Sequence, residues 1–344
     1  MPTAWSRRWE DLPMKLGRVG FATPEGLQPR IVAVLPEQNR VVDLLAAEAL
    51  RLRRRGAGQE AAARIAAALF PPSMAAALAA GPRFREAAEE ALSQAGDDTW
   101  RAIGDQTWLP ALDPPVMRDC LLFEGHLRNS FAKLGLEIPR EFFEAPPYYK
   151  GNPRTLVGHD AEIAWPAYAS YMDYELELGI VTGASGRNLD PEQARSLLFG
   201  VTILNDFSAR NVQAREMNAK LGPSKSKDFA TALGPWITTA DEVDVNDLTL
   251  RARVNGEEWS RGNSADMIFR PDEILAFISY GETVGPGELI GSGTVSGGCG
   301  LELGRQLNPG DVVELDISGI GTLRNRLGPP EHAGWDPASK VVKT

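Results

Sequence analysis

Two acidic residues stand two positions apart in an apolar segment of the chain, Met172–Val181 (MDYELELGIV). Alternate side chains of a strand share a face, so Glu175 and Glu177 are expected to project side by side. The opposite face would carry only Tyr, Leu and Ile side chains, which predicts a largely buried strand. Neighbouring buried carboxylates repel each other and need a proton, a basic side chain or a cation to neutralise them. An edge strand with solvated glutamates is the alternative interpretation.

A third acid, Asp206, ends the apolar run VTILND, after which the sequence turns into a helix. A carboxylate at the end of a strand is expected in a site, or it only caps the following helix in competition with Ser208. If Glu175, Glu177 and Asp206 converge, all the donors are hard oxygen atoms. Such donors suit Mg²⁺, Mn²⁺ or Ca²⁺ and disfavour zinc and copper.

One of the three histidines, His126, lies in an apolar context (RDCLLFEGHLRNSF). Imidazole is the side chain best matched to proton transfer near neutral pH, which makes His126 a candidate general base. A structural histidine is the alternative. His159 and His332 lie in polar turns and are expected at the surface. Asp119, seven residues before His126, is a further candidate ligand.

The glycine-rich run Gly291–Gly300 (GSGTVSGGCG) fits neither GxxxxGK[ST] nor GxGxxG, so we do not expect a nucleotide site there. Its glycines would let the backbone pass close to a ligand, and Thr294 adds a hydroxyl. Glu302, just after this run, is a carboxylate flanked by leucines. Lys227 could present a cation to an anionic substrate, or it is simply solvated.

The elements that must position these residues begin with a small β unit. Residues 14–50 are rich in β-branched residues between Gly, Pro and Asn, which predicts short strands with a turn at Pro24–Gly26. Residues 59–94 are Ala-rich, with breaks at Pro71–Pro72 and Gly81–Pro82. This pattern predicts two or three short helices.

A Pro-bearing connector, residues 109–115 (LPALDPP), follows these helices. It predicts a boundary between an N-terminal β and helical domain, residues 1–115, and a larger domain, residues 116–344.

The larger domain is expected to be mostly β. Leu248–Val254 alternates apolar and polar residues and meets Asn255–Gly256, which predicts a hairpin with a type I′ turn. Pro271 opens a predicted short helix, where its missing N–H costs nothing. Strands are expected again at 312–317 and 321–327. The fold class predicted is α+β, mainly β.

Composition excludes several classes of function. The chain has 344 residues, with 36 Lys and Arg against 46 Asp and Glu and a formal net charge of -10. Because such a surface repels phosphate backbones, nucleic acid is not expected as a partner. Two distant cysteines, Cys120 and Cys299, with no CxxC pair, make no disulfide framework or structural zinc site and fit a reducing cytoplasm. Residues 65–80 are too short for a membrane span of ~20 residues, and residues 1–12 lack the apolar run of a signal peptide.

Six ordered segments resemble the fumarylacetoacetate hydrolase family. They are RDxxxFExH (118–126), MDYELELG (172–179), NDFSAR (205–210), LGPxxxKDFAT (221–231), SGTVSG (292–297) and PGDVVELDISGIGTLRN (from 309). The resemblance covers about residues 116–327, with a looser match over the N-terminal β unit. It implies a C-terminal mixed β-sheet roll that carries the active site.

The resemblance also implies roles for particular residues. A divalent metal would be held by Glu175, Glu177 and Asp206, with Asp119 also approaching it. His126 would work with Glu302 to activate water. The remaining matches, to positions that contact the metal shell or the substrate, are Lys227, Gln213, Thr294 and Tyr149.

The implied cofactor is a divalent cation, Mg²⁺ first and Mn²⁺ or Ca²⁺ as alternatives, which acts as Lewis acid and template. The implied substrate is a small 2-oxo acid of the 1,3-dicarbonyl or acylpyruvate type, as in aromatic catabolism, and the reaction is hydrolysis of a carbon–carbon bond with departure of an enolate. Leu121 and Met217 stand where fumarylacetoacetases carry substrate-facing tyrosines, so fumarylacetoacetate itself is not the expected substrate. A homodimer is implied by the resemblance alone.

Three alternatives stay open from the sequence. The same family and metal could serve decarboxylation, hydration or isomerisation of a 2-oxo acid, including substrates of the oxaloacetate or 2-hydroxyhepta-2,4-dienedioate type. A binding protein that kept the cation without turnover is disfavoured by the presence of both His126 and Glu302. A glycosidase is disfavoured because two same-face glutamates serve a cation better than they straddle a sugar.

Overall fold

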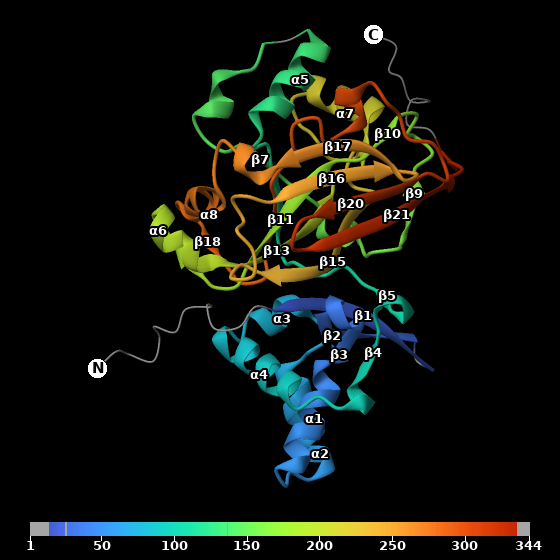
Figure 1. Ribbon diagram of the computed structural model, residues 1–344. Helices are drawn as coiled ribbons and strands as arrows, with labels where there is room; N and C mark the ends of the chain where they lie inside the picture. The colour runs from blue at the N-terminus through green and yellow to red at the C-terminus, as the bar shows by residue number, and fades with distance from the viewer. Residues whose placement is uncertain (1–13, 25, 136, 336–344) are drawn as a thin grey trace.

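The computed structural model describes residues 14–24, 26–135 and 137–335, and its largest sheet runs through both halves of the chain (Figure 1). In these residues the sheet has twelve strands, in the order β4-β3-β2-β1-β15-β13-β11-β19-β6-β7, with β5 beside β1 and β8 beside β15. The bounds are β1 (Lys15–Thr23), β2 (Gly26–Leu35), β3 (Arg40–Asp43), β4 (Trp100–Ala102), β5 (Thr107–Trp108), β6 (Met117–Cys120), β7 (Tyr148–Lys150), β8 (Leu156–Val157), β11 (Leu176–Thr182), β13 (Leu198–Asn205), β15 (Thr231–Thr239) and β19 (Leu289–Gly291).

A second sheet packs against the C-terminal part of the first. It is formed, in order, by β17 (Glu257–Asn263), β16 (Thr249–Val254), β20 (Val312–Ile317), β21 (Gly321–Pro330) and β9 (Glu162–Trp165). Two short pairs complete the strands: β10 (Met172–Asp173) with β14 (Ser208–Ala209), and β12 (Gly186–Arg187) with β18 (Thr283–Val284).

The helices of the described residues are α1 (Leu44–Arg54), α2 (Gln59–Leu69), α3 (Met74–Leu78), α4 (Pro82–Ser93), α5 (Glu124–Leu134), α6 (Pro191–Ala194), α7 (Arg210–Asn218), α8 (Pro271–Ser279) and α9 (Gly300–Leu303). Helices α1 to α4 lie by the N-terminal strands, α6 and α8 lie together at one side of the β-rich part, and α5 and α7 lie above it (Figure 1). Short 3₁₀ turns are η1 (Pro36–Gln38), η2 (Asp97–Thr99), η3 (Ile103–Asp105), η4 (Arg140–Phe143), η5 (Pro153–Thr155), η6 (Arg195–Leu197) and η7 (Ser264–Asp266).

The large sheet is buried on both faces, and each face belongs to a separate apolar cluster. One cluster joins alternate residues of β11 and β13 to the second sheet and includes Leu178, Ile180, Ile203, Leu250 and Leu315. The other joins the opposite face to the N-terminal helices and includes Leu44, Phe70, Phe84, Leu204 and Leu289. All residues of β11, which carries Glu177, are buried, as predicted for the segment with the paired glutamates. Glu175 lies just before this strand and is also buried.

The N-terminal predictions are confirmed in part. Strands span residues 15–43, but the prediction that they continue to residue 50 is wrong, because α1 begins at Leu44. The Asp43 side chain accepts a hydrogen bond of 3.2 Å from the Ala46 N–H and caps this helix. The acid inside VVDLL therefore ends a strand and starts a helix. Helices α2, α3 and α4 break at the predicted prolines and glycine.

The C-terminal predictions are confirmed. Asn255 and Gly256 have φ values of 52° and 82°, as a type I′ turn requires, and they join β16 to β17. Pro271 is the first residue of α8, and β20 and β21 cover the predicted strands. The fold class is the mixed α and β class predicted, and the C-terminal part has more residues in strands than in helices.

The first strand extends the sheet of the larger C-terminal part. β1 pairs antiparallel with β15 through Lys15↔Thr238 and Leu16↔Ile237. The Leu109 N–H donates to the Arg18 carbonyl, so the connector also lies along β1. The two predicted domains, divided at residue 115, thus share one sheet, and their independence stays a prediction.

None of the helices in the described part of the chain is long and apolar enough to cross a bilayer. The prediction about a signal peptide concerns residues 1–12, which lie outside the described residues.

An aromatic pair at the contact between the N-terminal strands and the second sheet offers a test of this shared core. The rings of Trp108 and Trp236 are 5.7 Å apart, both are buried, and the Trp236 indole N–H donates to the Ile320 carbonyl. We expect Trp108→Ala to lower the free energy of unfolding by about 3–5 kcal/mol, because it empties a large buried volume. Urea unfolding followed by far-ultraviolet circular dichroism measures this change.

The control is Tyr280→Ala, which removes an aromatic side chain that is 83% exposed and should change stability by about 0.5 kcal/mol or less. Equal effects of the two substitutions would show that the aromatic pair does not hold the N-terminal strands to the rest of the fold.

Candidate active site

Glu175 and Glu177 lie side by side where β10 gives way to β11. The strand pairing breaks at residues 174 and 175, and the Glu175 N–H donates to the side-chain oxygen of Asn205 at 3.0 Å. Both glutamates are buried, with exposures of 5% and 0%. The alternative of an edge strand with solvated glutamates is therefore wrong.

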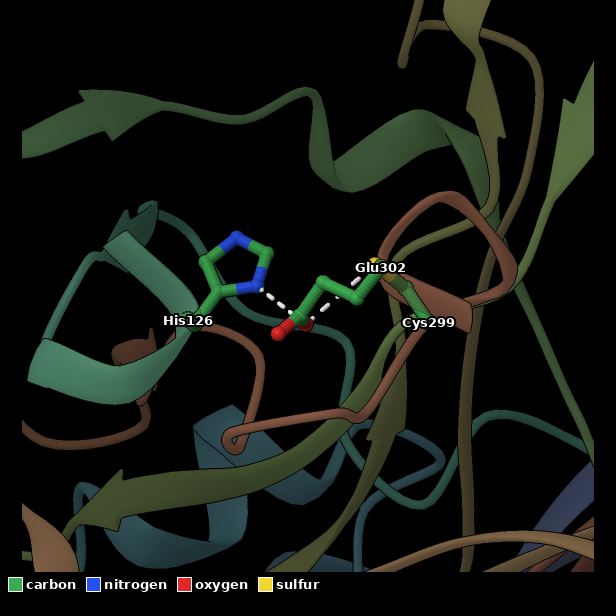
Figure 2. A group of neighbouring side chains, drawn as sticks. All are labelled: His126, Cys299 and Glu302. Atoms are coloured by element: carbon green, nitrogen blue, oxygen red, sulfur yellow. Dashed lines mark hydrogen bonds and ion pairs between the residues drawn. The ribbon is translucent and has the colours of Figure 1, made fainter. Parts of the chain in front are cut away.

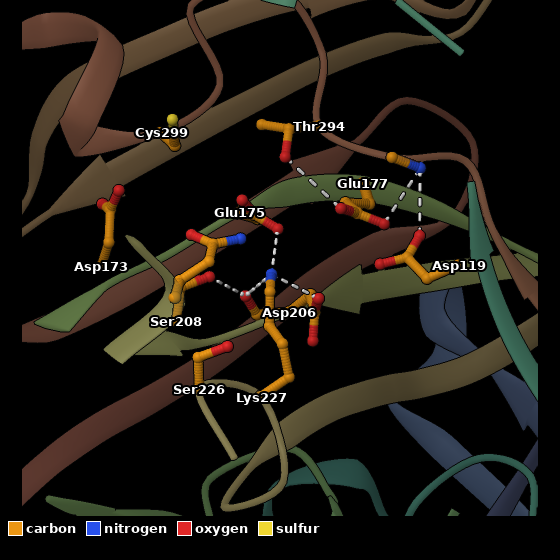
Figure 3. A network of polar contacts seen from close by, with 12 residues as sticks. Asp119, Asp173, Glu175, Glu177, Asp206, Ser208, Ser226, Lys227, Thr294 and Cys299 are labelled. Carbon is orange, nitrogen blue, oxygen red and sulfur yellow. Dashed lines mark hydrogen bonds and ion pairs between the residues drawn. The ribbon is translucent and has the colours of Figure 1, made fainter. Parts of the chain in front are cut away.

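Asp119 reaches the same place from another strand. β19 lies between β6 and β11, and Gly291 of β19 is in register with both Asp119 and Gly179. One carboxylate oxygen from each of Asp119, Glu175 and Glu177 lies within 4.8 Å of the others (Figure 3). A Cβ atom on Gly291 would lie 2.3 Å from Asp119 Oδ1, so the close approach of these groups requires glycine there.

Two of these carboxylates, Asp119 and Glu177, have raised pKa values. Burial and then the charge of Asp206 raise the pKa of Asp119 well above its ordinary value, and burial and then Asp119 raise the pKa of Glu177 likewise. In the described part of the chain neither forms an ion pair; the backbone N–H of Gly293 donates to both, at 3.3 and 3.2 Å. The Thr294 hydroxyl donates to Glu177 at 3.4 Å.

Glu175, by contrast, is neutralised by basic side chains. Lys227 Nζ lies 2.6 Å from Glu175 Oε2 and 2.5 Å from Asp206 Oδ2, and Arg210 pairs with Glu175 Oε1 at 2.7 Å. Burial opposes ionisation of Glu175, but Lys227 and then Arg210 outweigh it and hold its pKa at about 2. Burial likewise opposes the charge of Lys227, yet Asp206 and Glu175 raise its pKa.

Asp206 joins the cluster through Lys227. It follows the last residue of β13, is fully buried, and accepts hydrogen bonds from the Tyr149 hydroxyl at 2.6 Å and the Thr231 hydroxyl at 3.1 Å. Helix α7 begins after Ala209 with no side-chain cap, so the interpretation of Asp206 or Ser208 as a helix cap is wrong. Burial and then Asp206 raise the pKa of Tyr149, which keeps its hydroxyl a donor.

The donors in this cluster fit a divalent cation. Up to four buried carboxylates supply only hard oxygen atoms, which is the ligand set of Mg²⁺, Mn²⁺ or Ca²⁺. Asp119 and Glu177 form no ion pair in the described residues, and burial followed by neighbouring carboxylates raises their pKa values. A cation among Asp119, Glu175 and Glu177, next to Asp206, would offset the negative charge gathered there.

His126 and Glu302 form a second group (Figure 2), and His126 lies near enough to Glu175 for its charge to lower the pKa of that carboxylate. His126 projects from α5 and Glu302 from α9, and His126 Nδ1 lies 2.6 Å from Glu302 Oε1. Glu302 Oε2 accepts from the Asn129 amide at 2.7 Å and the Gly297 N–H at 2.8 Å. Burial opposes ionisation of Glu302, but the hydrogen bond and charge of His126, together with the hydrogen bonds from Asn129 and Gly297, outweigh it and lower the pKa of Glu302. An ionised Glu302 accepts from Nδ1–H and leaves Nε2 of His126 with its lone pair.

A buried ion pair connects the two groups. Arg210 donates to Asp173 at 2.8 Å while it pairs with Glu175. The carboxylate of Asp173 also accepts the N–H groups of Gly300 at 2.7 Å and Leu301 at 3.0 Å, at the start of the helix that carries Glu302. The positions of Glu175 and of α9 are therefore coupled.

All ten residues predicted for the site lie in or beside this network. Gln213 is the outermost of them; its side-chain oxygen accepts from Arg210 at 2.9 Å. The other two histidines lie elsewhere: His332 is exposed, as predicted, and His159 is half-buried and accepts the Arg324 N–H, so its prediction as a surface residue is only partly right.

Sequence reasoning missed Arg210, Asp173, Asn129 and Thr231. Asn129 lies three residues after His126 on α5, so helical spacing could have placed both on one face. Arg210 stands in the segment NDFSAR, but a basic residue near an acid does not reveal that it binds both Asp173 and Glu175. Asp173 carries no local signal of its contact with α9.

A cavity of about 840 Å³ lies away from these residues, between the N-terminal strands and the second sheet. Trp108, Trp236 and Ile320 line it together with the ion pair Lys15–Glu242. None of the ten predicted site residues lines this cavity, so the candidate site is defined by the polar network and not by this hollow.

Comparisons with known proteins show a family match and similar proteins in other organisms. Residues 116–328 match the family described as fumarylacetoacetate hydrolase, C-terminal. YisK of Bacillus subtilis, an oxaloacetate tautomerase, is 33% identical over 218 residues, 62% of this chain and 71% of that protein. An uncharacterised protein of Staphylococcus aureus is 31% identical over 249 residues, 70% of this chain and 80% of that protein.

Solved structures share the fold over nearly the whole chain. A fumarylacetoacetate hydrolase from Exiguobacterium antarcticum superposes with a TM-score of 0.67 at 24% identity, covering 92% of this chain and 99% of that one. A maleylpyruvate hydrolase from a Sphingobium species, in complex with manganese(II) and pyruvate, gives 0.66 at 20% identity, covering 92% and 100%. These structures show the shared fold. The family match over residues 116–328, together with the 33% identical relative, shows that the chain belongs to the fumarylacetoacetate hydrolase family.

Proposed function

We propose that this protein is a divalent-cation-dependent enzyme that hydrolyses a carbon–carbon bond in a 2-oxo acid of the 1,3-dicarbonyl or acylpyruvate type. The observation that carries the proposal is the pair His126–Glu302, with 2.6 Å between Nδ1 and Oε1, beside the buried carboxylates of Asp119, Glu175 and Glu177. A positioned base next to a cation site is what water attack and enolate departure require.

The cation would be held by Asp119, Glu175, Glu177 and Asp206, with Mg²⁺ first and Mn²⁺ or Ca²⁺ as alternatives. When bound, it supplies a Lewis acid and positive charge for the carbonyl and enolate oxygens of the substrate. The hard oxygen donors support this assignment. So does the manganese(II) ion with pyruvate in the maleylpyruvate hydrolase of the same fold.

The residues of this chain divide the remaining work. His126 Nε2 takes a proton from water, and the water oxygen forms a bond to the distal carbonyl carbon. Glu302 stabilises the imidazolium that results. The carbon–carbon bond then breaks, its electrons pass to the enolate, and the imidazolium returns a proton to that carbon. Lys227 and Gln213 donate to the oxyanion or the leaving enolate, and Thr294 and Tyr149 orient the carboxylates that face the substrate.

Keto–enol tautomerisation of a 2-oxo acid is the second candidate. The tautomerase relative, 33% identical, favours it. The same His126 could take a proton from carbon and return it to oxygen, with no water added. Both reactions need the pair His126–Glu302 and the cation, so the products distinguish them. Decarboxylation and hydration stay predictions of the same kind.

A substrate panel tests the proposal directly. With acetylpyruvate and Mg²⁺ we expect acetate and pyruvate in equal amounts, detected by proton NMR. Turnover should stop when EDTA is added and should return when Mg²⁺ is supplied in excess. Enol–keto exchange of oxaloacetate without cleavage of acetylpyruvate would support the tautomerase instead. Binding of the cation without turnover of acetylpyruvate, oxaloacetate or a 2-oxo-alkenoate would exclude both.

Separate variants test the base and the cation site. His126→Ala should lower kcat by about 10²–10⁴-fold, the usual contribution of a general base, while Mn²⁺ binding stays at wild-type affinity. Glu177→Gln should weaken Mn²⁺ binding, because the cation loses a charged ligand. Electron paramagnetic resonance of free Mn²⁺ measures binding, and initial rates measure kcat.

The controls are His159→Ala and Glu257→Gln, which make comparable changes outside the network, and both should behave as wild type. Wild-type rates in His126→Ala, or unchanged Mn²⁺ binding in Glu177→Gln, would remove the basis of the assignment.

The pH profile tests the partnership of His126 and Glu302. Because its pKa is lowered, Glu302 loses its charge only as the pH falls through that lowered value, so the carboxylate stays ionised near neutral pH. Glu302→Gln leaves the imidazolium without this negative charge. We expect a lower kcat in this variant. We also expect the fall of kcat/KM at acidic pH to begin at a lower pH than in the wild type. Glu124→Gln, the same change at a partly exposed position of α5, should leave the profile in place.

The homodimer implied by the family stays a prediction, as do the cytoplasmic location and the role in aromatic catabolism. Light scattering coupled to size-exclusion chromatography would test the homodimer.

A further inference from the structure

Glu302 belongs to a second group of side chains that are able to bind a metal ion. His126, Cys299 and Glu302 each offer one donor atom, and these three atoms lie within 4.8 Å of one another (Figure 2). Cys299 Sγ donates to Glu302 Oε1 at 3.5 Å, and His126 Nδ1 contacts the same oxygen. Cys299 is the residue before α9, so its side chain and that of Glu302 lie on the same turn.

The donor types differ from those of the carboxylate cluster. The cluster around Asp119 offers only oxygen, whereas this group offers imidazole nitrogen, thiol sulfur and one carboxylate oxygen. Mixed nitrogen and sulfur donors select borderline-soft ions such as Zn²⁺ and Co²⁺ over Mg²⁺. A tetrahedral zinc ion holds its ligand atoms roughly 3–4 Å apart. Here His126 Nδ1 and Cys299 Sγ lie 2.6 and 3.5 Å from Glu302 Oε1.

We propose that His126, Cys299 and Glu302 form a second cation site, selective for Zn²⁺ over Mg²⁺, whose occupation inhibits the enzyme. Binding forms bonds to Nδ1, Sγ and Oε1, and the Nδ1 and thiol protons pass to solvent. The hydrogen bond between His126 and Glu302 is lost. The inhibitory consequence rests on the proposed function of that pair; the cation site itself does not.

Two features of the surroundings weaken cation binding at this site. Burial raises the pKa of the Cys299 thiol, so the ion must displace a proton that is firmly held. Arg210 stands near enough to act on that thiol, and its positive charge opposes a further cation. Its guanidinium is already paired with Asp173 and Glu175, which limits this repulsion. These features predict a site that fills when zinc is in excess and empties with a chelator.

Cobalt(II) provides a readout that does not depend on turnover. The full-length protein, with excess Mg²⁺ to fill the carboxylate cluster, is titrated with Co²⁺ and its absorption spectrum recorded. We expect a thiolate-to-cobalt charge-transfer band, which oxygen ligands cannot produce. The chain has two cysteines, so Cys299→Ser should abolish the band and Cys120→Ser should leave it. Cys120 lies in β6, outside the group of three donors.

His126→Asn is a second test of the site, which remains valid if Cys299→Ser fails to fold. It keeps the thiol and removes the nitrogen ligand, and the Co²⁺ concentration at half-saturation should rise more than about tenfold, since even an outer partner contributes 10–100-fold to a metal site. No band in the wild type, a band that survives Cys299→Ser, or unchanged affinity in His126→Asn would each overturn the second site.

Inhibition is measured separately, at saturating Mg²⁺. The rate of each protein is expressed relative to its own rate without zinc. The Zn²⁺ concentration that halves this relative rate should be more than about tenfold higher in Cys299→Ser than in the wild type, and unchanged in Cys120→Ser. Equal zinc sensitivity in all three proteins would overturn the inhibitory role. If no substrate of the panel is turned over, the proposed function fails, while the cobalt spectrum still decides the cation site.

Discussion

The repulsion among buried carboxylates is the constraint on which this structure depends. Four carboxylates are exposed by 5% or less: Asp119, Glu175, Glu177 and Asp206. Lys227 is in direct contact with only two of them, Glu175 and Asp206. Arg210, the other basic partner of Glu175, is shared with Asp173. The fold therefore holds more negative charge than the described basic side chains offset, and such an arrangement favours a divalent ion over a structural salt bridge.

The sheet makes this concentration of charge possible. β19 lies between β6 and β11, so residues far apart in sequence, Asp119 and Glu177, come close across a strand that offers Gly291 at the contact. The backbone N–H of Gly293 then serves both carboxylates. The base comes from helices instead of strands, and Asp173 fixes the start of α9 with the same carboxylate that binds Arg210. Charge and base are thus positioned by separate elements with one common link.

Local patterns in the sequence account for part of this site. Strand alternation predicted that Glu175 and Glu177 share a face, and the end of an apolar run predicted Asp206 at a site. The role of His126 came from the family resemblance, since its own context allowed a structural histidine. Arg210 and Asp173 were beyond sequence reasoning because their contact depends on the pairing of β10 with β14, two strands of two residues each. Helix α1 was missed for a similar reason: whether Asp43 continues a strand or caps a helix is decided by packing.

The continuity between β1 and β15 means that the N-terminal residues act as an edge cover. β15 offers its N–H and C=O groups at Ile237 and Thr238 to β1, and the connector runs along the same strand. A shortened chain that began at β6 would leave this backbone unpaired, a ready template for pairing with other chains. The N-terminal portion therefore shields a sheet edge that would otherwise be free to pair with other chains.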